Sequence, residues 1–103
     1  MGKIAEQNRN ATYYSVLSDQ PKVRRDVLEA IAESGADGIT RHELADKLRR
    51  PLSSMCARVS ELEDAGHVVE TTKSRQTQYG GSATVVVLSS SLVVGGLVQK
   101  TLF

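Results

Sequence analysis

Cysteine, proline and aromatic residues are scarce in this sequence of 103 residues, which has one Cys, two Pro, no Trp, three Tyr and one Phe. A single Cys cannot form a disulfide within the chain, and a lone thiol is typical of a reducing compartment. With one Cys and two His, a zinc site would need carboxylates or a partner chain. The hydrophobic core must therefore be built mainly from aliphatic side chains.

An excess of charge of either sign is also missing. Thirteen Lys and Arg stand against twelve Asp and Glu, for a net charge of +1, which excludes a polybasic coat and an acidic solvating tail. No segment reads as a signal peptide. Residues 85–103 are partly apolar, but Ser, Gly, Gln and Lys interrupt them, whereas a membrane-spanning helix needs about 20 predominantly apolar residues. We therefore expect one soluble domain with no membrane partner.

Motifs of enzymatic chemistry do not occur in the sequence. It has no Gly-rich phosphate loop, no Gly-x-Ser-x-Gly elbow and no His-Glu-x-x-His helix. We assign no catalytic role to His42 or His67, and Cys56 has no His or Asp near it in the sequence that could activate it. We expect no enzymatic activity, no cofactor and no metal.

The chain begins with a polar segment and continues with a helical pattern. Residues 1–20 contain few large apolar side chains, so they are expected to be either a partly disordered leader or an arm or short helix that docks on a partner. In residues 21–34 the apolar side chains share one helical face, which predicts a helix that ends at Gly35. These side chains are Val23, Val27, Leu28 and Ile31.

Two further helices are predicted after a short turn. Thr40-Arg41-His42-Glu43 is a capping box, which predicts a helix that runs to Arg49-Arg50 and is broken by Pro51. A third helix is predicted for residues 52–65, because its apolar residues form a single stripe before Gly66. The stripe consists of Met55, Val59, Leu62 and Ala65.

After Gly66 the hydrophobic period changes to two. Residues 67–71 and 83–88 predict antiparallel strands, joined by a long polar loop of residues 72–82 that has basic residues but no acid. The expected fold is α+β, a winged helix-turn-helix of three helices plus a β-hairpin wing. This domain would span residues 21–89, between the leader and an apolar β tail of residues 90–103.

Residues 36–88 contain a spaced pattern with an Arg-x-x-Glu-Leu third helix and an Arg-x-Thr wing. The full pattern is Asp37-Gly38-Ile39-Thr40, Glu43-Leu44-Ala45, Leu48, Pro51, Arg58, Glu61-Leu62, Gly66, Val68, Arg75, Thr77, Gly80, Ala83 and Val85. With this pattern, residues 36–88 resemble the winged helix-turn-helix domains of small phage and bacterial regulators. The resemblance implies sequence-specific binding of double-stranded DNA and transcription regulation, in the cytoplasm of a bacterium or a phage-infected cell.

In such a fold the third helix enters the major groove, so its polar face holds the candidates for base contact. Arg58 is the candidate for reading a guanine with its guanidinium fork. The alternative for Arg58 is an ion pair with Glu61 or Glu43. The other candidates are small side chains that can donate to phosphate or base edges, or touch a thymine methyl group: Ser53, Ser54, Cys56 and Ala57.

Positive charge gathers around this helix although the whole chain is nearly neutral. Basic residues outnumber the two acids of residues 38–60, and the predicted loop of residues 72–82 adds more. Each could contact phosphate, and those in the wing could also enter the minor groove; the alternative for each is a solvated surface side chain. The candidates are Arg41, Lys47, Arg49 and Arg50, and in the wing Lys73, Arg75, Gln76 and Gln78.

The apolar tail needs a surface that covers it, because an exposed strand of this kind promotes aggregation. Either its own domain or a second copy would serve, and a homodimer would also place two third helices one duplex turn apart. The near-zero net charge also leaves a rival function open, a protein-interaction module that binds a host or phage protein complex. Winged helices serve both purposes, so the fold alone does not decide between them.

Overall fold

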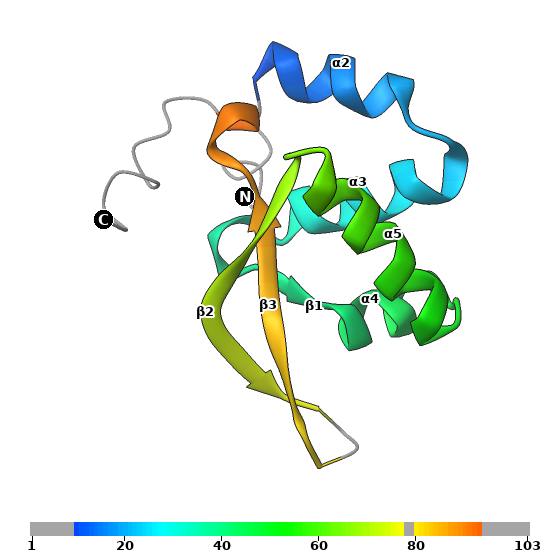
Figure 1. Ribbon diagram of the computed structural model, residues 1–103, viewed down its shortest axis with the longest axis vertical. Coiled ribbons are helices and arrows are strands. Elements are labelled where there is room, and N and C mark those ends of the chain that lie inside the picture. Colours follow the sequence, from blue (N-terminus) through cyan, green and yellow to red (C-terminus); the bar gives the residue numbers. More distant parts are fainter. Residues whose placement is uncertain (1–9, 78–79, 94–103) are drawn as a thin grey trace.

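The computed structural model describes residues 10–77 and 80–93 (Figure 1). Its three strands form one antiparallel sheet in the order β1-β3-β2. Helices α3, α4 and α5 followed by the β2–β3 hairpin confirm the expected α+β winged helix-turn-helix. In chain order the elements are α2 (Ala11–Asp19), α3 (Lys22–Glu33), the 3-10 helix η1 (Gly35–Asp37), β1 (Ile39–Thr40), α4 (Arg41–Leu48), α5 (Leu52–Asp64), β2 (Val68–Gln76), β3 (Ser82–Leu88) and the 3-10 helix η2 (Ser90–Leu92).

The helix-turn-helix begins and ends at residues whose chemistry explains the boundaries. The Thr40 hydroxyl accepts a hydrogen bond from the Glu43 amide at 3.1 Å, and the Glu43 carboxylate accepts one from the Thr40 amide at 2.9 Å. This is the predicted capping box. Helix α4 ends at Arg49, whose backbone is left-handed with φ 56° and ψ 49°. Pro51 then stands at the N-cap of α5.

The core lies between the helices and one face of the sheet, and it is aliphatic apart from Tyr13 and Met55. Each of α3, α4 and α5 contributes the apolar face that its sequence period predicts. The central strand β3 supplies Val86 and Leu88 to the same cluster. The largest contributions from the helices come from Leu28, Ile31, Leu44, Met55, Val59 and Leu62.

Part of the N-terminal segment is ordered and packed. Residues 11–19 form α2, which Asn10 caps by accepting a hydrogen bond from the Tyr13 amide at 3.1 Å. The Tyr13 side chain is 1% exposed and belongs to the core cluster. The expectation of a disordered leader is therefore wrong for residues 11–19, because burial of one large ring outweighs a polar composition. Residues 1–9 lie outside the described part of the chain.

The beginning of the tail packs on its own domain. Leu92 is buried, and its carbonyl accepts a hydrogen bond from the Asn10 amide at 3.3 Å, while the Asn10 side chain donates to the Ser91 carbonyl at 3.0 Å. Residues 90–92 form the 3-10 helix η2, which corrects the expectation of a β tail at this point. Leu92 therefore does not need a second copy to cover it. Residues 94–103 of the predicted tail are not among the described residues.

The hairpin is longer than the sequence suggested. Ser74 pairs with Thr84, and the ladder continues to Gln76 opposite Ser82. The prediction of a long loop over residues 72–82 is therefore wrong, because ladder hydrogen bonds join backbone groups and do not require apolar side chains. The register shifts between Glu70 and Ser74, and there the Thr71 hydroxyl donates to the Val85 carbonyl at 2.9 Å.

Candidate nucleic-acid interface

Helix α5 has one buried and one exposed face, as its sequence predicts. Met55, Val59 and Leu62 of the predicted stripe are fully buried. Ala65, its fourth member, is exposed because it stands at the C-cap after the last turn of α5, so the prediction is wrong for that residue. On the opposite face, the part of the helix up to Ser60 carries small, uncharged side chains at helical spacing, and the exposed Asp64 follows at the C-terminal end. Ser53, Ala57 and Ser60 are exposed on this face, and Ser54 and Cys56 are half-buried beside it.

The wing extends to the same end of the molecule as the beginning of this helix. The β2–β3 hairpin reaches past the body of the protein toward the end where α4 and the start of α5 lie, whereas α2 and η2 lie at the opposite end (Figure 1). A duplex that meets the beginning of α5 would therefore also meet the hairpin. This is the arrangement that reading DNA with a third helix and a wing requires.

Arg58 is held in an ion pair within α5. Its Nε and Nη2 atoms donate to the two carboxylate oxygens of Glu61, each at 2.8 Å. Glu61 also accepts a hydrogen bond from Arg24 of α3 at 3.1 Å, so one carboxylate holds two guanidinium groups. The hydrogen bond from Arg58 lowers the pKa of Glu61, and the same contact raises the pKa of Arg58. The guanidinium fork that would read a guanine is thus occupied by Glu61.

Arg75 lies near the distal end of β2 and is bound to the helical part of the protein. Its Nη1 atom donates to Oε1 of Glu43 at 2.7 Å, and its Nη2 atom donates to the Asp37 carbonyl at 2.7 Å. Burial raises the pKa of Glu43, but the Thr40 amide and Arg75 outweigh that effect and leave the pKa below its ordinary value. Arg75 therefore joins β2 to the capping box of α4.

Arg41 and Lys47 also have acidic partners. The Arg41 Nη2 atom lies 3.2 Å from Glu63 and 2.9 Å from Glu70, and the Arg41 side chain is only 18% exposed. Burial raises the pKa of Glu63, and the neighbouring Glu70 carboxylate acts in the same direction, against Arg41. Lys47 lies 3.7 Å from Glu33 on the surface, where an ion pair contributes little.

The cations outside these ion pairs are concentrated at the helix-turn-helix turn and in the wing. Arg49 and Arg50 form the turn between α4 and α5, and Lys73 is exposed on β2. Arg25 of α3 is also outside them, and no ion pair of any of the four occurs within residues 10–77 and 80–93. Gln76 is exposed at the end of β2, and Gln78 lies outside the described residues.

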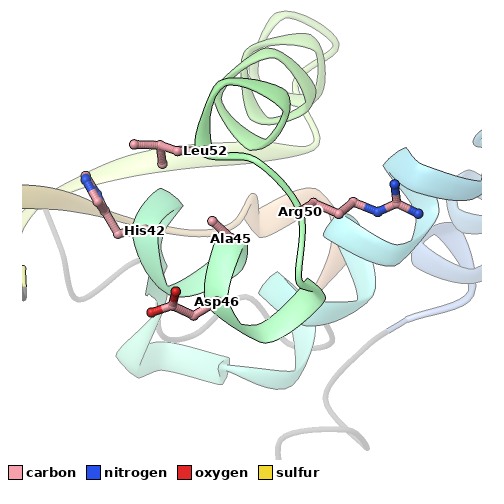
Figure 2. A pocket seen from close by; sticks show the side chains of 5 residues that line it. All are labelled: His42, Ala45, Asp46, Arg50 and Leu52. Atoms are coloured by element: carbon pink, nitrogen blue, oxygen red, sulfur yellow. The ribbon is translucent and has the colours of Figure 1, made fainter.

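A shallow cleft of about 410 Å³ opens beside the turn. It is lined by His42, Ala45, Asp46, Arg50 and Leu52, and Arg50 extends away from the other four side chains (Figure 2). Its lining mixes charges of both signs with two small apolar surfaces. Within the described ranges no group of three or more His, Cys, Asp or Glu could hold a metal ion, and no helix is long and apolar enough to cross a membrane.

The sequence indicated one of the carboxylates that pair with these arginines, Glu61, and named Glu43 only as a partner of Arg58. Arg58 and Glu61 are three residues apart, a spacing that brings side chains together on a helix, and this ion pair was the alternative considered for Arg58. Glu43 pairs with Arg75 across 32 positions, and no local pattern in the sequence signals that contact.

The fold and the position of α5 define a winged-helix domain of the DNA-binding class. Residues 21–93 match the family model of the B-block binding subunit of TFIIIC, a winged-helix-like DNA-binding domain. The match covers more than half of the chain, which therefore belongs to this family. No curated protein and no solved structure matches the chain.

Proposed function

We propose that the protein binds double-stranded DNA sequence-specifically, with α5 in the major groove and the wing against the phosphate backbone. One observation carries the proposal: the exposed face of α5 has small side chains up to Ser60, while cations without ion pairs in the described part of the chain stand at the turn before it and in the wing. Small side chains let the helix approach the base edges. Arg49, Arg50 and Lys73 supply the charge that neutralises phosphates.

A salt series tests this proposal. Each phosphate neutralised contributes a slope of about −0.9 to the logarithm of affinity against the logarithm of salt concentration, so three cations predict about −2.7. The slope of this plot should become shallower by about 0.9 in each of three variants, Arg49→Ala, Arg50→Ala and Lys73→Ala. Lys22→Ala is the control, because Lys22 pairs with Asp26 at 3.2 Å and lies at the start of α3.

Base reading by α5 has its own test. Selection from a random duplex library should enrich a defined motif, and Ala57→Glu should abolish binding by placing a carboxylate on the exposed face. Ala11→Glu makes the same chemical change on α2, at the end of the molecule away from the wing (Figure 1), and should bind normally. Absence of binding at low salt by the unchanged protein would contradict the proposal and leave protein interaction as the remaining function.

We further propose that the protein acts without enzymatic activity, as a homodimeric transcription regulator in the cytoplasm of a bacterium or a phage-infected cell. The resemblance of residues 36–88 to small phage and bacterial regulators supports the biological setting. The apolar composition of residues 94–98 supports self-association. Light scattering should give a dimer for the full chain and a monomer for a chain that ends at Val93. A monomeric full chain would contradict the homodimer.

A further inference from the structure

The guanidinium group of Arg75 connects the wing to two separate parts of the helical body. It donates to the Glu43 carboxylate of α4 at 2.7 Å and to the Asp37 carbonyl at 2.7 Å, with a longer contact of 3.4 Å to the Gly38 carbonyl. Arg75 itself lies on β2, more than 30 positions away along the chain from these acceptors. The contact therefore bridges the distal part of the hairpin and the beginning of the helix-turn-helix.

Both attachment points are rigid. The Oε1 atom of Glu43 that accepts from Arg75 also accepts from the Thr40 amide in the capping box, which holds the carboxylate in place. Gly38 has φ +73° and is pressed against β3, where a Cβ would overlap the Val85 side chain and lie 2.7 Å from the Val86 carbonyl oxygen. Because neither acceptor can shift easily, the hydrogen bonds of Arg75 fix the position of β2 relative to the helices.

The hairpin needs such an attachment at this position. Strand β1 pairs with β3 at Val85 and Val86, so Ser74, Arg75 and Gln76 of β2 face β3 in a ribbon of two strands. A two-stranded ribbon has little rigidity of its own. The register shift between Glu70 and Ser74 loosens the ladder further at the place where Lys73 is exposed.

We propose that Arg75 is a positioning residue: it sets the angle of the wing against the helix-turn-helix, so that Lys73 and α5 meet one duplex together. This inference rests on the proposed DNA binding and goes beyond it by assigning Arg75 to the geometry of the interface, with Lys73 as the phosphate contact that it positions. The sequence had suggested instead that Arg75 touches DNA itself.

A double-mutant cycle in DNA binding tests the coupling. The salt slope is measured for the unchanged full chain, Lys73→Ala, Arg75→Gln and the double variant. Lys73→Ala should reduce the steepness by about 0.9 in the unchanged background and have almost no effect in the Arg75→Gln background. A purely structural role for Arg75 would lower thermal stability but leave the effect of Lys73→Ala equal in both backgrounds, and that result would overturn the inference.

Two further variants separate the remaining outcomes. Arg75→Lys keeps the charge but cannot reach the Glu43 carboxylate and the Asp37 carbonyl together, so it should behave like Arg75→Gln. Retention of full affinity by Arg75→Lys would indicate direct phosphate contact and contradict positioning. Glu43→Ala removes the carboxylate that accepts from Arg75, while the Thr40 hydroxyl can still accept from the amide of residue 43. It should show the same loss of coupling if Arg75→Gln does not fold.

The outcomes for function and for positioning are distinguishable. If the unchanged protein does not bind duplex, the proposed function fails, and positioning has no interface on which to act. If it binds but Lys73→Ala changes nothing in either background, the function stands and the positioning inference is overturned.

Discussion

Arg58 and Glu61, one turn apart on α5, share two parallel hydrogen bonds of 2.8 Å. The pair places a carboxylate beside the residue of this helix best suited to read a guanine. Arg41 and Arg75 are held by acidic side chains in the same way. Much of the positive charge near the interface therefore holds helices and strands together, and a smaller part of it is available to a duplex.

Removal of the Glu61 carboxylate should strengthen DNA binding. Glu61→Gln takes a negative charge from α5 and releases Arg58 and Arg24 from their shared partner, so affinity for duplex should rise severalfold at low salt. Fluorescence anisotropy titrations measure the change. Glu29→Gln on α3 removes an equal charge from an exposed residue and is the matched control; an equal gain in both variants would mean that only net charge matters.

The role of Arg58 itself follows from a comparison of two kinds of duplex. If its guanidinium fork passes from Glu61 to a guanine on binding, Arg58→Ala should weaken selected sequences more than random ones. Competition titrations with both duplexes measure the ratio. Equal losses for both would place Arg58 permanently in the intrahelical ion pair.

Replacement of Arg49 should separate stability from binding. A non-glycine residue in the left-handed region costs roughly 1 kcal/mol, and Arg49 adopts φ 56° there. Arg49→Gly should therefore raise the free energy of unfolding by about 1 kcal/mol while it weakens duplex binding. Arg49→Ala removes the same charge without relieving the strain, so it should weaken binding equally and give no gain in stability. Urea unfolding and DNA titration of both variants check this.

Stability should fall in acid because of Glu43 and Glu61. The pKa of each carboxyl lies below its ordinary value of 4.5 in the folded protein. The ionised carboxylates therefore contribute their full stabilisation to the fold above pH 4.5, and this contribution is lost as the pH falls through the folded pKa. The pKa of Glu63 is raised in the folded protein, so protonation of Glu63 favours the folded state and offsets part of the loss of stability in acid. Glu43→Gln should flatten the acid limb in urea unfolding followed against pH. Unchanged curves for Glu43→Gln would contradict the assignment.

Two neighbouring tyrosines give a matched test of the packing of α2. Tyr13 is 1% exposed and Tyr14 is 51% exposed. Their rings pack edge to face, with the ring centroids 5.0 Å apart. Tyr13→Ala should lower the free energy of unfolding by about 3 kcal/mol through the cavity that it leaves. Tyr14→Ala should cost about 0.5–1 kcal/mol, the value of a lost edge contact. Similar losses in urea denaturation would contradict the placement of Tyr13 in the core.

The parts of the fold that could be predicted depend on neighbours in the sequence. The capping box at Thr40 and Glu43 closes within one helical turn, and the stripe of Met55, Val59 and Leu62 follows from the helical period alone. The docking of Tyr13 had no such signal, because α2 packs against η2, whose Leu92 belongs to the same core cluster but lies far away along the chain. The extension of β2 to Gln76 was missed for a related reason, since it depends on backbone pairing with β3.

The sequence by itself determined the three helices, the turn between the second and third, and the hairpin. It also determined the small, uncharged side chains on the exposed face of α5 up to Ser60. Only the tertiary structure decided which basic side chains remain available for a partner. Arg75 and Glu43 are 32 positions apart, and Arg41 and Glu70 are 29 apart, so no local pattern could pair them. An ion pair between distant residues exists only after packing has brought the two side chains together, and that packing leaves Arg49, Arg50 and Lys73 without ion pairs within residues 10–77 and 80–93.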